Sequence, residues 1–125
     1  MPRKPQQSRS KATVKAILEG ALRSIRQDGF DKLTTNSIAE HGGVSVGSIY
    51  EYFEGKEEII DALFMNFVEA INLMVEESRE DLLGLPVDHL VETLLKKFGE
   101  LLGRDGQTYF ILAQHLMHRN TEKYL

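Results

Sequence analysis

The sequence has no cysteine among its 125 residues. That absence excludes disulfide bonds, a thiol nucleophile and zinc-finger thiolates, and it is compatible with a reducing cytoplasm. Long hydrophobic runs are also missing, because polar residues interrupt even the most apolar stretch, residues 59–75. The N-terminus lacks the apolar segment of a secretory signal. We therefore expect a cytoplasmic protein with no membrane-spanning helix.

Catalytic and metal-binding motifs are equally scarce. We find no glycine-rich phosphate loop and no nucleophile motif. The four histidines are scattered. The one pair at metal-like spacing is His115 and His118, and no carboxylate on the adjoining turns completes a ligand set, Glu122 being a remote candidate. We expect neither an enzyme nor a metal or cofactor site.

Charge is unevenly distributed along the chain. The formal net charge is −4, yet residues 1–56 hold nine Lys and Arg against six Asp and Glu, while residues 57–125 hold six against thirteen. A basic first part joined to an acidic remainder fits a DNA-binding domain attached to a part that does not touch DNA. Two solvent-exposed faces that differ in the sign of their charge without any role in DNA binding would give the same distribution of charged residues.

Apolar residues at helical spacing predict an all-α protein, since no segment alternates with the period of a strand. Residues 1–10 hold two prolines and are predicted to be a flexible arm, in which Arg3, Lys4, Arg9 and Lys11 are either phosphate contacts or part of an ordinary tail. Beyond it we predict a scaffold helix over about 10–28, two short helices, and longer ones over about 56–80, 87–102 and 108–119.

The two short helices lie between Thr34 and Lys56. Thr34 and Thr35 are suited to cap the first of them, and the glycines at 42 and 43 are suited to end it. Ser45 can cap the second, in which Ile49 and Phe53 are spaced to point into a core. Two short helices joined by a glycine turn, with small, polar and aromatic residues outside, predict a helix-turn-helix.

The stretch IAEHGGVSVGSIYEYFEGKEEIIDAL resembles the DNA-binding signature of the TetR family of bacterial transcriptional regulators. The matching elements are Ile38-Ala39, Gly42-Gly43-Val44-Ser45, Gly47-Ser48-Ile49-Tyr50, Tyr52-Phe53 and Lys56-Glu57. The resemblance covers about the first half of the chain. It implies a DNA-binding domain over residues 1–56, followed by a helical regulatory domain over 57–125 that we expect to be incomplete. Family members commonly continue for several more helices, so the chain is either a truncated product or an unusually short member.

The second short helix is the expected recognition helix. Serine hydroxyls, phenolic hydroxyls, an ammonium group and a glycine that allows close approach are suited to contact duplex DNA. Together with Thr35, a phosphate contact by resemblance, the predicted contacts are Ser45, Val46, Gly47, Ser48, Tyr50, Tyr52 and Lys56. Two residues depart from the family's common pattern. Val46 can meet a thymine methyl but cannot hydrogen-bond a guanine edge, and the carboxylate of Glu51 either points away from phosphates or weakens binding.

The resemblance further implies a repressor that binds a palindromic operator as a homodimer and is released by a small hydrophobic ligand. Candidate ligand contacts are Phe64, Phe67, Met74, Phe98, Tyr109, Phe110 and Met117. For each of them a place in the helical core is the competing interpretation. A second functional hypothesis is a helical protein-interaction module that has lost operator binding because of Val46 and Glu51.

Overall fold

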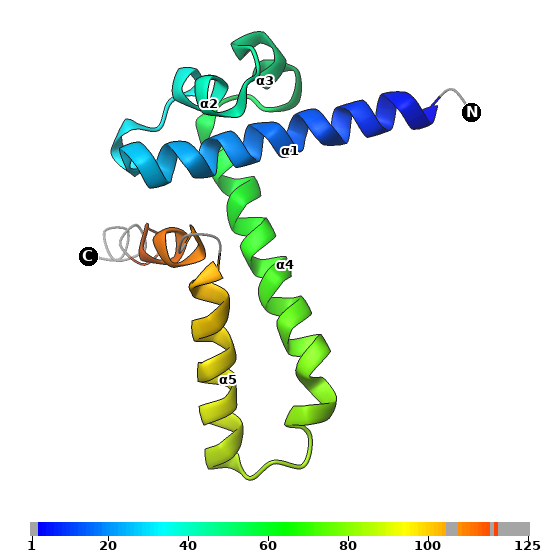
Figure 1. The fold of residues 1–125 in the computed structure, drawn as a ribbon, viewed down its shortest axis with the longest axis vertical. Coiled ribbons are helices and arrows are strands. Elements are labelled where there is room, and N and C mark those ends of the chain that lie inside the picture. The colour runs from blue at the N-terminus through cyan, green and yellow to red at the C-terminus, as the bar shows by residue number, and fades with distance from the viewer. Residues whose placement is uncertain (1–2, 105–107, 116, 118–125) are drawn as a thin grey trace. The chain divides into compact units, whose positions relative to one another are not determined.

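The computed structural model describes residues 3–104, 108–115 and 117, with side chains described from residue 8 onward. The described part is helical and contains no strand, which confirms the predicted all-α class (Figure 1). Its elements are α1 (Arg3–Asp28), the short 3-10 helix η1 (Phe30–Lys32), α2 (Thr35–Gly42), α3 (Val46–Tyr52), α4 (Lys56–Leu82) and α5 (Val87–Leu102). Residues 108–115 form a further helical segment.

The chain divides into two compact units, the first ending at Leu63 and the second beginning at Phe64. The first unit therefore includes the opening turns of α4, where Ile59, Ile60 and Leu63 are buried. Within the described residues, no helix is both long and apolar enough to cross a lipid bilayer.

Helix α1 begins well before the predicted start of the scaffold helix. It runs from Arg3, so the arm expected over residues 1–10 is helical from that residue onward. Pro5 does not prevent this, because proline is tolerated in a first turn, whose N–H groups have no intrahelical acceptor. At the other end Gly29, with a positive φ of 88°, donates its N–H to the Ile25 carbonyl at 2.9 Å and follows the last residue of α1.

Helices α1 and α2 form the main contact within the first unit, and two glycines let their backbones approach closely. A Cβ atom added at Gly20 would lie 2.6 Å from the carbonyl oxygen of Ile38 and 2.7 Å from the Cα of Gly42. Gly42 was expected to help end α2, but it is the last residue of the helix and faces α1. The left-handed cap is Gly43 alone, with φ 66°.

The N-terminus of α2 is held by a reciprocal pair of hydrogen bonds. The Thr34 hydroxyl accepts from the Ser37 N–H at 3.0 Å, and the Ser37 hydroxyl accepts from the Thr34 N–H at 3.0 Å. The buried Ser24 of α1 donates to the Ser37 hydroxyl at 2.8 Å. The cap therefore fixes the start of α2 and also fastens it to α1.

Thr34→Ala is expected to lower the free energy of unfolding by about 1 kcal/mol, because it removes the acceptor for one N–H of the first turn. Urea titration of the purified protein measures this. Asn36→Ala is the control, since Asn36 is exposed two residues further on and is not the cap residue. Equal stability of the wild type and the Thr34→Ala variant would contradict the capping role.

In the second unit, an aromatic cluster packs between α4, α5 and the helical segment over residues 108–115. Phe67 is buried, with its ring centroid 5.0 Å from that of Tyr109 and 6.3 Å from that of Phe98. Helix α5 has the predicted limits, but its apolar stripe is wider than the face it buries. Val87 and Leu95 are 76% and 67% exposed. These two side chains find no cover among the described residues.

Candidate nucleic-acid interface

Helices α2 and α3 form the predicted helix-turn-helix. Ser45 caps α3 by accepting from the Ser48 N–H at 3.0 Å. Ile49 is completely buried and fixes the inner face of α3. Phe53, also predicted to be core, is the residue that ends α3 and is only half-buried. The burial of Ile49 turns the opposite face of α3 toward solvent.

Two of the predicted DNA contacts lie side by side at the surface. Tyr50 is 54% exposed, and its hydroxyl lies 3.4 Å from the Thr35 hydroxyl at the start of α2. The pair therefore presents two hydroxyl groups from two different helices at one place. Both can donate to phosphate oxygens, and the N-terminus of α2 adds a favourable dipole.

Two other predicted contacts also hold the domain together. The Tyr52 hydroxyl donates to the Ser10 hydroxyl of α1 at 3.3 Å. The Lys56 ammonium group donates to the Leu33 carbonyl at 3.2 Å. Tyr52 is half-buried, whereas Lys56 remains exposed at the first residue of α4. The first hydrogen bond joins α3 to α1, and the second joins the start of α4 to Leu33, which lies between η1 and α2.

The outer line of α3 carries Gly47 and Glu51. Both are exposed, whereas Val46 is half-buried. Ser48 is half-buried and accepts a hydrogen bond at 2.9 Å from the Ser45 hydroxyl. The structure thus brings the eight predicted contact residues into one region of the first unit, and their role in DNA binding stays a prediction.

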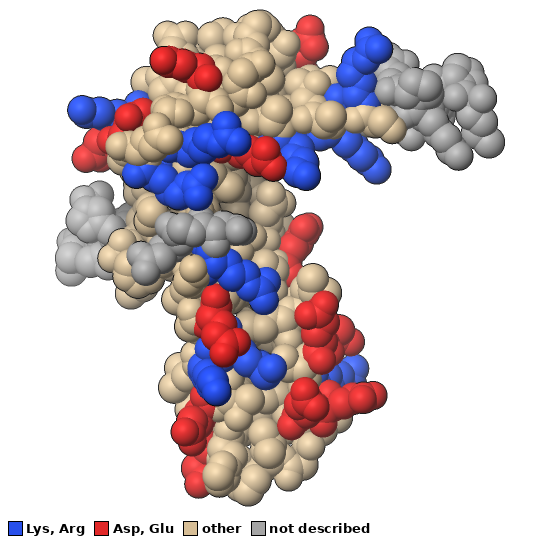
Figure 2. Space-filling model, in the orientation of Figure 1, with Lys and Arg blue, Asp and Glu red and all other residues tan. Residues whose placement is uncertain are grey.

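Basic side chains of α1 accompany this surface. Arg9 and Lys11 are exposed and flank Ser10, the residue that hydrogen-bonds Tyr52 of α3. Lys15 is also exposed, and its ammonium group lies 4.0 Å from the Glu19 carboxylate. On the face shown in Figure 2, Lys and Arg gather along α1, Asp and Glu predominate along α4, and charges of both signs lie along α5. The positive potential expected from the sequence is therefore concentrated on the scaffold helix rather than on α3.

His41 is half-buried in the last turn of α2. In the structure its ring nitrogen Nε2 lies 3.1 Å from a carboxylate oxygen of Asp28, and its carbonyl accepts from Arg23 at 3.1 Å. Asp28 and Arg23 both belong to α1, so His41 fastens the end of α2 to the scaffold. No local pattern indicates this contact, because it joins residues 13 and 18 positions apart.

The predicted ligand contacts occupy several different environments in the second unit. Phe67, Phe98 and Tyr109 form the aromatic cluster, Phe64 is half-buried, and Phe110 and Met117 are 41% and 69% exposed. The structure therefore does not bring the seven residues together around one cavity. Their role in ligand binding stays a prediction.

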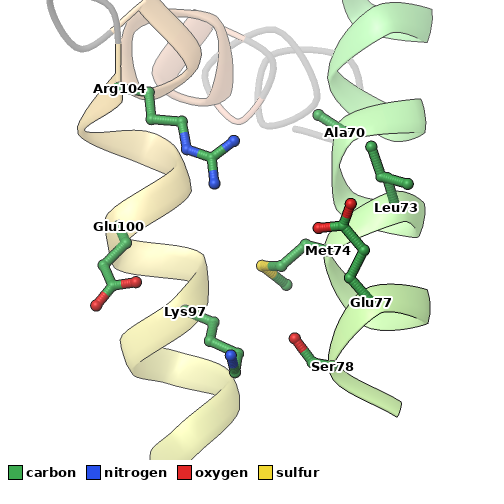
Figure 3. Close-up of a pocket in the computed structure, with 8 residues that line it drawn as sticks. All are labelled: Ala70, Leu73, Met74, Glu77, Ser78, Lys97, Glu100 and Arg104. Carbon is green, nitrogen blue, oxygen red and sulfur yellow. The ribbon is translucent and has the colours of Figure 1, made fainter.

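A cavity of about 150 Å³ lies between α4 and α5 (Figure 3). Met74 is the one predicted ligand contact among its lining residues, which are Ala70, Leu73, Met74, Glu77, Ser78, Lys97, Glu100 and Arg104. Figure 3 shows the side chain of Arg104, a residue that follows α5, reaching toward α4. The volume is below the roughly 300 Å³ at which pockets for drug-sized ligands begin.

The histidine pair considered for a metal is only partly described. His118 and Glu122 lie outside the described residues. Within the described part of the chain, no group of three or more His, Cys, Asp and Glu side chains could hold a metal ion.

Comparison with known proteins assigns this helical domain. Residues 17–63 match the model for bacterial regulatory proteins of the tetR family. The fatty acid metabolism regulator protein of Bacillus subtilis is 33% identical over 107 residues, which are 85% of this chain and 54% of that protein. The transcriptional regulator TtgR of Pseudomonas putida is 30% identical over 106 residues, covering 85% of this chain and 49% of TtgR. The chain thus spans about half the length of these two relatives.

Solved structures agree with this assignment. The fatty acid degradation regulator FadR of Bacillus halodurans superposes with a TM-score of 0.65 at 25% identity, over 82% of this chain and 51% of FadR. A TetR-family regulator of Haemophilus influenzae shares the fold, with a TM-score of 0.61 at 18% identity, over 76% of this chain and 51% of that one. Residues 17–63 therefore form a domain of the type found in the TetR family of bacterial regulatory proteins, and the chain belongs to that family.

Proposed function

We propose that this regulator binds duplex DNA through α3 and represses transcription from a palindromic operator in the bacterial cytoplasm. The observation that carries the proposal is the surface on which Tyr50 and Thr35 lie beside the exposed side of α3, while exposed Arg9 and Lys11 of α1 flank Ser10, the hydrogen-bond partner of Tyr52. Buried Ile49 holds α3 in this orientation. A helix presented in this way fits the width of a B-DNA major groove.

The operator geometry follows from symmetry. Two copies related by a two-fold axis would insert their α3 helices into successive major grooves, about 34 Å apart. The proposal therefore includes a homodimer of the full-length protein. Sedimentation of the protein with a selected duplex tests this, since it should give two protomers for each palindrome. A complex of one protomer on one half-site would contradict it.

Ligand control is the third part of the proposal. A small hydrophobic molecule bound in the helical domain would change the angle of α4 and with it the distance between two recognition helices. The name of the B. subtilis relative ties that protein to fatty acid metabolism, so acyl compounds are the first class to test. The ligand should release the protein from DNA in an anisotropy titration, whereas unchanged binding with every acyl compound would contradict this choice.

The rival function is a protein-interaction module without an operator. The observation in its favour is that neither Val46 nor Glu51 of α3 can donate a hydrogen bond to a base or a phosphate. A gel-shift titration against genomic fragments separates the two functions. Binding that persists in the presence of competitor DNA supports the regulator, and no binding even at low salt supports the module.

Tyr50→Phe and Lys56→Ala should each weaken DNA binding by about 1 kcal/mol or more for all sequences, because each removes a donor to phosphate. Fluorescence anisotropy with a selected duplex and with a random duplex measures both affinities. Tyr109→Phe and Lys97→Ala are matched controls in the second unit and should bind as the wild type does. If both test variants are folded and bind DNA normally, the contact assignment is wrong.

A further inference from the structure

We propose that Glu51 is the base-reading residue of α3 and that it selects a cytosine through the exocyclic amino group N4 in the major groove. This inference rests on the proposed function, because it gives the chemistry of a DNA interface on α3. It gives the Glu51 carboxylate a role in binding, whereas the sequence predicted that it either points away from phosphates or weakens binding.

The position of Glu51 on α3 is the first support. Successive residues of a helix are separated by 100°, so the side opposite buried Ile49 carries Gly47 and, one turn later, Glu51. Both residues are exposed. A Cβ atom added at Gly47 would meet only the Ser45 hydroxyl, at 3.8 Å. No side chain on the preceding turn therefore stands between Glu51 and an approaching DNA base.

The partners of the neighbouring side chains are the second support. Ser48 is hydrogen-bonded to Ser45, and Tyr52 to Ser10. The Tyr50 hydroxyl lies beside that of Thr35. The Glu51 side chain makes no hydrogen bond and no ion pair with the described residues of the chain. Its carboxylate is the acidic group on α3 that remains available for an intermolecular donor.

The chemistry of the major groove then selects the partner. A carboxylate is an acceptor only, and phosphate oxygens and the N7 and O6 atoms of guanine are acceptors too, so these groups repel it. The groove offers amino donors on two bases, N4 of cytosine and N6 of adenine. Adenine places its acceptor N7 beside N6, whereas the neighbour of N4 on cytosine is a C–H group. The Glu51 carboxylate can therefore accept a hydrogen bond from N4 of cytosine without facing an acceptor atom of the same base.

The experiment is selection of bound duplexes from a random pool by the wild-type protein, Glu51→Gln and Glu51→Ala. The wild type should enrich sites with a cytosine at one fixed position of each half-site. Glu51→Gln should change that position to adenine, because an amide pairs with N6 and N7 together. Glu51→Ala should lose the preference there, by about tenfold or more, while other positions keep theirs.

Glu54→Gln separates base reading from net charge. Glu54 follows α3 and is exposed, so its neutralisation should raise the affinity for all duplexes and leave the selected sequence unchanged. If Glu51→Gln behaves like Glu54→Gln and enriches the wild-type sequence at every position, the inference is overturned while the proposed function stands. If the wild type enriches no sequence and binds no duplex, both are overturned.

Discussion

Gly20→Ala should lower the free energy of unfolding of the first unit by about 2–3 kcal/mol, the upper part of the range for overpacked sites. The added Cβ would lie 2.6 Å from the Ile38 carbonyl oxygen and 2.7 Å from both the Cα and N of Gly42. These are backbone atoms, so no side-chain rotation relieves the overlap. Helices α1 and α2 would have to separate, and the orientation of α3 would change with them.

Gly47→Ala is the matched control for this prediction. It adds the same methyl group to a helical glycine of the same unit, but in open space 3.8 Å from the Ser45 hydroxyl. Its stability should equal or slightly exceed that of the wild type, since alanine is the better helix former. Thermal and urea unfolding followed by circular dichroism measure both variants. Equal stabilities for Gly20→Ala and Gly47→Ala would show that the two helices do not pack as described.

Affinity for DNA should fall about a thousandfold when salt rises from 50 to 200 mM, the lower end of the range for six to ten phosphate contacts. Arg9, Lys11 and Lys56 are exposed cations in the first unit. Lys56 follows α3 in the sequence, and Arg9 and Lys11 flank Ser10, which accepts a hydrogen bond from Tyr52 of α3. Two protomers would then neutralise about six phosphates, which gives a logarithmic slope near −5. Anisotropy titrations at several salt concentrations provide this slope.

Lys11→Ala should make that slope shallower by about two, because each protomer of a dimer loses one phosphate contact. Lys96→Ala removes the same charge from an exposed position on α5, in the second unit, and should leave the slope unchanged. A slope near zero for the wild type would contradict a phosphate interface. Equal effects of the two substitutions would show that net charge, rather than the α1 surface, governs binding.

Local features of the fold were predictable because each depends on a few adjacent residues. Thr34 and Ser45 cap their helices as expected, and Gly43 ends α2. The periodic apolar residues of α5 predicted its limits at Val87 and Leu102. Each of these features depends on turn chemistry or helical spacing that a short segment contains in full.

Contacts between distant residues were not predictable in the same way. The approach of Gly20 to Gly42, the hydrogen bond from Tyr52 to Ser10 and that from Lys56 to Leu33 join different elements. They depend on how helices pack, and a single sequence does not specify that packing. The limit of α1 was wrong for a local reason: the proline at position 5 was taken as evidence for an arm, although a first helical turn accepts it.

Selection of duplexes from a random pool, followed by guanine N7 methylation of the selected site, tests the central claim most directly. Methylation places a group in the major groove, where α3 is proposed to lie. The account predicts an enriched palindrome on which methylation within the half-sites prevents binding, with the two sensitive segments about one helical turn apart. No enriched sequence, or an enriched site whose binding is indifferent to methylation in the major groove, would contradict it.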